Sequence, residues 1–131
     1  MKRDNLVLVI TSLLSILLMT LHLTSDAIRA AAGTPEAGGS TLVAMPILVI
    51  WLYGTLMLAE RRSGHIIMLI GSLMAVGMPL LHVMGPAGMF HGYLARVPPA
   101  FLFVWTLHAL GVTGLFSLLL SIRGLWILRR G

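Results

Sequence analysis

The chain has 131 residues, of which 58% are hydrophobic and only 10% are charged. Its mean hydropathy is +0.99. A soluble domain has about 25% charged residues, so this composition excludes an ordinary soluble domain and a disordered chain. The chain contains no cysteine, which excludes disulfides, thiolate metal sites and a cysteine nucleophile.

Four apolar segments are each predicted to form a membrane-spanning helix, which needs about 20 mainly apolar residues. In chain order they cover residues 6–23, 42–59, 66–85 and 100–122. Glycine and proline fall mostly between these segments, where they favour turns. We therefore predict an all-α fold, a four-helix transmembrane bundle that forms a single domain over residues 1–131.

Lysine and arginine residues are distributed unequally between the two ends of the predicted bundle. One end, with both termini and the link between the second and third helices, has seven of them: Lys2, Arg3, Arg61, Arg62, Arg123, Arg129 and Arg130. The other end has Arg29 and Arg96. This bias predicts a protein integral to the cell (inner) membrane with both termini in the cytoplasm. Because the net charge of +5 comes from helix ends, we exclude nucleic acid as a partner.

A weak internal similarity relates the two halves of the chain. With a shift of 60 residues, residues 10–22 align with residues 70–82, and five of these thirteen positions are identical, including His22 over His82. This pattern favours two repeated helical hairpins, a plan known in membrane proteins. The alternative is a chance match between leucine-rich segments. A true repeat would place His22 and His82 at the same depth on helices of the same direction.

Polar and small residues follow one face of three predicted helices. In the first helix the steps of three and four residues define one stripe: Ser12, Ser15, Met19, His22 and Asp26. Similar stripes in the third and fourth helices are Gly71, Ala75, Met78 and His82, and His108, Gly111, Gly114, Ser117 and Ser121. Helix contacts in lipid favour such residues, so we expect the three stripes, with their histidines, to face one another.

The histidines are the candidate ligands of a metal or cofactor. Neutral imidazole binds zinc, copper, iron and haem iron. A b-type haem could be held by two of His22, His82 and His108. A transition-metal ion (Cu, Zn or Fe) could instead be held by members of a wider set: His22, Asp26, His82, His91 and His108. The alternative is that each histidine only makes a hydrogen bond within the bundle.

The sequence therefore favours a small integral membrane protein that binds a metal ion or b-type haem in the outer half of the bundle. Electron transfer and metal handling both remain open as its role. The alternatives are a non-catalytic accessory or assembly subunit of a larger membrane complex, and a small transporter that forms by oligomerisation. The expected partners are the lipid bilayer and either another membrane protein or further copies of the chain. No catalytic motif decides whether the protein is an enzyme.

Overall fold

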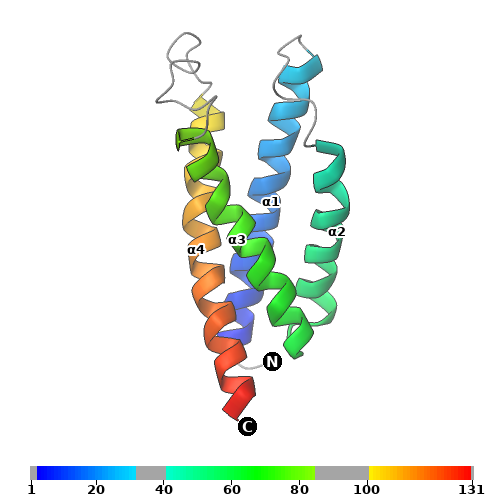
Figure 1. Cartoon of the computed structure of the whole chain (residues 1–131), viewed down its shortest axis with the longest axis vertical. Coiled ribbons are helices and arrows are strands. Elements are labelled where there is room, and N and C mark those ends of the chain that lie inside the picture. The colour runs from blue at the N-terminus through cyan, green and yellow to red at the C-terminus, as the bar shows by residue number, and fades with distance from the viewer. Residues whose placement is uncertain (1–2, 32–40, 85–100, 131) are drawn as a thin grey trace.

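The computed structural model describes residues 3–31, 41–84 and 101–130, and this part of the chain folds into four helices. They are α1 (Arg3–Ala31), α2 (Thr41–Met57), α3 (Arg62–Met84) and α4 (Phe101–Arg130). Successive helices run in opposite directions, so the start of α1 and the end of α4 lie at the same end of the bundle (Figure 1). The prediction of an all-helical, four-helix fold is confirmed.

Three of these helices, α1, α3 and α4, are long and apolar enough to cross a membrane. The second helix differs from the prediction, because α2 has only 17 residues and ends at Met57 rather than continuing to residue 59. A tight turn follows, in which the amide of Arg61 donates to the carbonyl of Leu58 over 2.8 Å. A side chain at Gly64 would collide with that carbonyl, so the turn requires glycine there.

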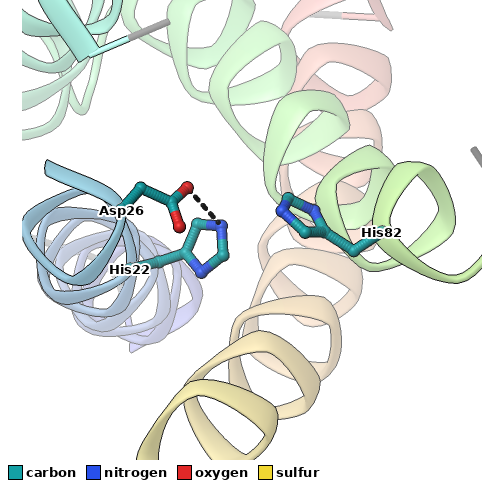
Figure 2. A group of neighbouring side chains, drawn as sticks. All are labelled: His22, Asp26 and His82. Atoms are coloured by element: carbon teal, nitrogen blue, oxygen red, sulfur yellow. Dashed lines mark ion pairs between the residues drawn. The ribbon is translucent and has the colours of Figure 1, made fainter. Parts of the chain in front are cut away.

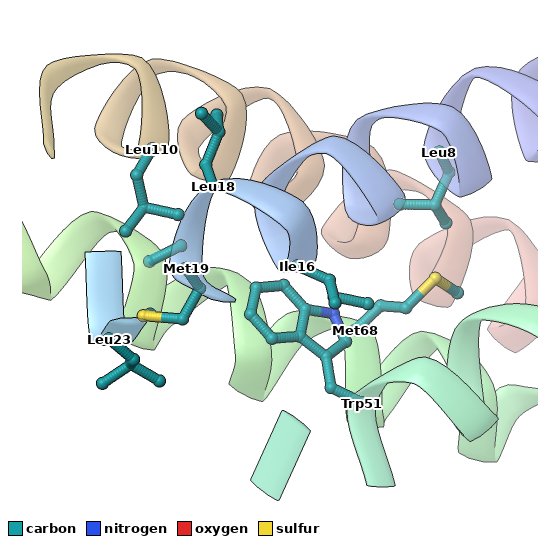
Figure 3. Packing of buried hydrophobic residues seen from close by; sticks show 9 residues of the cluster. Leu8, Ile16, Leu18, Met19, Leu23, Trp51, Met68 and Leu110 are labelled. Carbon is teal, nitrogen blue, oxygen red and sulfur yellow. The ribbon is translucent and has the colours of Figure 1, made fainter. Parts of the chain in front are cut away.

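A buried apolar cluster joins the four helices along the middle of the bundle (Figure 3). Trp51 of α2 lies at its centre and is only 2% exposed. The indole packs so closely on α3 that a methyl group at Gly71 would collide with the ring. The cluster contains nine buried residues: Leu8, Ile16, Leu18, Met19, Leu23, Trp51, Met68, Ala75 and Leu110.

A closed set of three hydrogen bonds ties α1 to α2 inside this core. The indole N–H of Trp51 donates to the hydroxyl of Ser12 over 2.9 Å. The hydroxyl of Thr55 donates to the backbone carbonyl of Trp51 over 2.9 Å, so the 2.8 Å contact between Ser12 and Thr55 has Ser12 as donor. Each of the three protons has an acceptor, which removes the cost of burying these polar groups.

Hydroxyl groups join α1 to α4 and α3 to α4, although Thr113 and Ser72, which take part, lie outside the predicted stripes. All five stripe residues of α1 are buried. Ser15 donates to Thr113 of α4 over 3.1 Å, and Ser72 of α3 and Ser117 of α4 are hydrogen-bonded at 2.8 Å. Small hydroxyl side chains at these positions let the helices approach closely, and each of these two bonds joins hydroxyl groups of different helices.

The outer surface of the bundle is largely apolar. Large aliphatic side chains are more than half exposed on all four helices, among them Leu17, Val49, Leu81 and Leu119. The internal repeat stays a prediction, because four alternating helices would be arranged in this way with or without duplication.

Candidate metal centre

Three of the predicted ligands meet at the end of the bundle opposite the chain termini. α1 supplies His22 and Asp26, which lie one turn apart on the same helix face. α3 supplies His82 close to its last residue, Met84. Figure 2 shows the two imidazole rings and the carboxylate turned toward one another. One ligand atom from each residue can be chosen so that all three lie within 4.8 Å of one another.

The pair on α1 already has the spacing of two ligands on one ion. Nε2 of His22 lies 3.4 Å from Oδ2 of Asp26. Two ligands at zinc distances of about 2.0–2.2 Å in a tetrahedron are separated by about 3.3–3.5 Å, so this pair needs little movement. The His22 side chain is completely buried, whereas that of Asp26 is 12% exposed. Packing therefore fixes His22, whereas Asp26 is partly exposed at the edge of the site.

A backbone carbonyl orients the imidazole of His82 and leaves its other ring nitrogen available to a metal. Its Nδ1 lies 3.0 Å from the backbone carbonyl of Met78. A carbonyl only accepts, so Nδ1 carries the proton and Nε2 keeps its lone pair. Atoms at the 4.8 Å limit would have to close by about 1.5 Å to reach the tetrahedral spacing. His82 is half-buried near the end of its helix, where a small shift of the last turn can provide that movement without a change of rotamer.

Phe103 of α4 forms an aromatic wall against both histidines. Its ring stacks on His22 with a centroid distance of 5.1 Å and an interplanar angle of 29°. It meets His82 at 5.6 Å and 64°, and the two imidazoles are themselves edge to face at 4.8 Å and 83°. Phe103 is only 3% exposed, so it closes one side of the site and restricts rotation of the buried imidazole.

His108 lies outside this group, contrary to the expectation that its side chain points into the bundle. It is exposed, and its Nδ1 donates to the carbonyl of Val104 over 2.8 Å. The predicted stripe ran from His108 to Ser117 in three steps of three residues. Each such step falls about 60° short of a full helical turn, so His108 ends about 180° away from Ser117, which is buried.

Within residues 3–31, 41–84 and 101–130, no further histidine joins the group. His91, also predicted as a ligand, lies outside the described residues. His65 lies at the opposite end of the bundle, where Nδ1 donates to the carbonyl of Arg61 over 3.1 Å. Across residues 3–31, 41–84 and 101–130, the cluster of His22, Asp26 and His82 is the one group of three or more such side chains with metal-binding spacing.

A cavity of about 290 Å³ also lies at the opposite end of the bundle, beside His65. Its wall includes Asp4 and Arg123, which form an ion pair at 2.9 Å between the start of α1 and the end of α4. Both side chains of that pair are more than half exposed, so water screens it and it adds little stability. This cavity is separate from the metal-ligating group. Asp4, Glu60 and His65 line it, but among the described residues they do not form a group with metal-binding spacing.

Two features of the site, the aromatic wall and the carbonyl that contacts His82, were not among the sequence predictions. Phe103 belongs to the buried face of α4 that runs through Leu107, Leu110 and Gly114 in steps of three and four. The alternating steps of four and three residues keep these side chains on one side of the helix, and this spacing is the signal in the sequence that points to the buried face. The carbonyl of Met78 lies four residues before His82, a spacing that any helical histidine has, so no specific signal pointed to it.

No protein-family model matches the chain, and neither the curated proteins nor the solved structures give a significant match.

Proposed function

We propose that this chain is a small integral membrane protein that binds one transition-metal ion through His22, Asp26 and His82. Membrane insertion is supported by three helices of sufficient length and by the apolar exterior of the bundle. An exposed apolar surface of this extent is unfavourable in water and favourable in a bilayer.

The charge distribution supports an orientation with the metal site on the outer side. Six arginines stand at the end with the chain termini: Arg3, Arg61, Arg62, Arg123, Arg129 and Arg130. The positive-inside bias assigns that end to the cytoplasm. The group formed by His22, Asp26 and His82 comes from the later part of α1 and the last turn of α3, which lie toward the other end of the bundle (Figure 1).

The observation that carries the metal proposal is the convergence of two imidazoles and one carboxylate from two helices. Burying a carboxylate in a membrane helix is costly, so a residue such as Asp26 is a candidate for a functional group. Imidazole and carboxylate ligands together suit first-row divalent ions such as Zn²⁺, Co²⁺ and Fe²⁺.

A metal ion fits this arrangement better than the b-type haem that the sequence also allowed. The rings of His22 and His82 are in direct edge-to-face contact, and Phe103 packs against both. A porphyrin between the two imidazoles would have to separate these rings and displace Phe103. Within the described residues, the two histidines therefore leave no slot for a haem between them.

The test is equilibrium binding of Zn²⁺ and Co²⁺ to the full chain in detergent micelles. We expect one ion per chain, with affinity reduced more than tenfold by His82→Ala and by Asp26→Asn, because each change removes one of three ligands. His108→Ala is the matched control, since this histidine is exposed and outside the group. Circular dichroism of each variant checks that the helices remain.

Equal binding by the wild type, His82→Ala and Asp26→Asn would show that the metal is held elsewhere. A wild-type protein that binds neither ion would overturn the proposal. The role of an accessory subunit in a larger membrane complex would then be the better explanation of the bundle.

A further inference from the structure

We infer that the metal ion bound by His22, Asp26 and His82 keeps a coordination position open for a small anion from solution. This inference rests on the proposed function, and it specifies what kind of ligand the site receives. Hydroxide, formed when bound water releases a proton to solution, is the natural example, and azide is a convenient probe because it is also a small monovalent anion.

The number of ligands is the first argument. The group supplies three ligand atoms, two imidazole nitrogens and one carboxylate oxygen. Zinc sites that serve only structure use four protein ligands, whereas zinc sites with three protein ligands bind water or substrate in the fourth position. The two-histidine, one-carboxylate set likewise leaves open positions on Fe²⁺. The described residues therefore supply three protein ligands, one fewer than a closed tetrahedral site needs.

Burial of the three ligands gives the direction of access. The His22 side chain is fully buried, and Phe103 stacks against its ring at 5.1 Å. The Asp26 side chain is 12% exposed, and His82 is half-buried at the end of α3. Phe103 thus closes the site from α4, and a ligand from solution reaches the ion past Asp26 and His82.

Charge balance selects an anion over a neutral ligand. A divalent ion with one carboxylate and two neutral imidazoles retains a net charge of about +1. A net charge in a largely desolvated site is unfavourable, and a monovalent anion in the open position neutralises it. The site therefore prefers hydroxide or another small anion over a thioether or a third neutral imidazole.

The experiment uses the full chain in detergent micelles, loaded with one equivalent of Co²⁺, whose visible absorption depends on its ligands. We expect azide to shift the cobalt bands in a saturable way, with one azide per cobalt, while cobalt stays with the protein on gel filtration. The control His108→Ala should give the same shift, because its side chain lies outside the site. Co²⁺ in buffer alone gives the reference spectrum for ion released by azide.

The possible failures are distinguishable. Absence of protein-bound cobalt bands would overturn the proposed function itself. Protein-bound cobalt whose spectrum does not respond to azide would leave the metal site standing and overturn the open position. If azide leaves the cobalt spectrum of the wild type unchanged but shifts that of His91→Ala, His91 is the fourth ligand, and the inference is overturned. Release of cobalt from the protein by azide would also overturn the inference of an open coordination position.

Discussion

The packing of Trp51 on α3 predicts opposite effects for one substitution at two positions of the same helix. A Cβ atom at Gly71 would lie 2.7 Å from Cγ of Trp51 and closer still to two other ring atoms. A Cβ atom at Gly77 would meet nothing within 4 Å. Both Gly71→Ala and Gly77→Ala remove a flexible residue from a helix, so the backbone contribution is the same in both variants.

The magnitude follows from two terms. Replacing glycine by alanine within a helix stabilises it by about 0.5–1 kcal/mol. Overpacking a filled core costs about 1–3 kcal/mol, because Trp51 is buried and its N–H is committed to Ser12. Gly77→Ala should therefore raise the free energy of unfolding slightly. Gly71→Ala should lie below Gly77→Ala by about 1–3 kcal/mol, since the backbone term cancels in the difference.

The assay is equilibrium unfolding in mixed micelles of a mild detergent and dodecyl sulfate, followed by circular dichroism. Fluorescence in a background in which Trp105 and Trp126 are replaced by phenylalanine reports on Trp51 alone. We expect the emission of Trp51 to change in Gly71→Ala and to stay the same in Gly77→Ala. Equal stabilities and unchanged emission in both variants would refute the packing of Trp51 on α3.

Two further predictions concern the core hydrogen bonds and the aromatic wall. Ser12→Ala should lower the free energy of unfolding by about 1–3 kcal/mol, because it removes the acceptor of the Trp51 N–H. The control Thr24→Ala, at an exposed position, should change it by less than about 0.5 kcal/mol. Equal losses of stability in the two variants, measured in the same unfolding assay, would contradict this account. Phe103→Leu should weaken Zn²⁺ binding about two- to tenfold, because an aromatic pair contributes about 0.5–1.5 kcal/mol to holding His22. A competition titration measures this affinity. An affinity equal to that of the wild type would show that the stacking does not position the imidazole.

Much of the architecture could be predicted from hydropathy alone. The four apolar segments correspond to the four helices, and the stripe from Ser12 to Asp26 is buried as expected. Periodicity succeeds in α1 because steps of three and four alternate there and keep a constant direction. Helix ends were less predictable: α2 stops at Met57 because the backbone turns to place Gly64 against Leu58, a contact that composition does not reveal.

The candidate site was only partly predictable for the same geometric reason. His22 and Asp26 are neighbours on one helix, so their spacing fixes their relative position. The approach of His82 to His22 depends on how α3 packs against α1, which the proposed repeat suggested but which the spacing of residues in the sequence does not determine. The prediction for His108 is wrong because three successive steps of three residues do not follow one face of a helix. Together they rotate the side-chain direction by about 180° from Ser117 to His108.

The most direct test of the metal site is to locate the ion by anomalous diffraction from crystals of the full chain loaded with Zn²⁺. The account predicts one anomalous peak at the end of the bundle opposite the chain termini. That peak should lie about 2.0–2.2 Å from a nitrogen of His22, a nitrogen of His82 and an oxygen of Asp26. A peak at His65 or beside the ion pair of Asp4 and Arg123, with none among those three side chains, would contradict it.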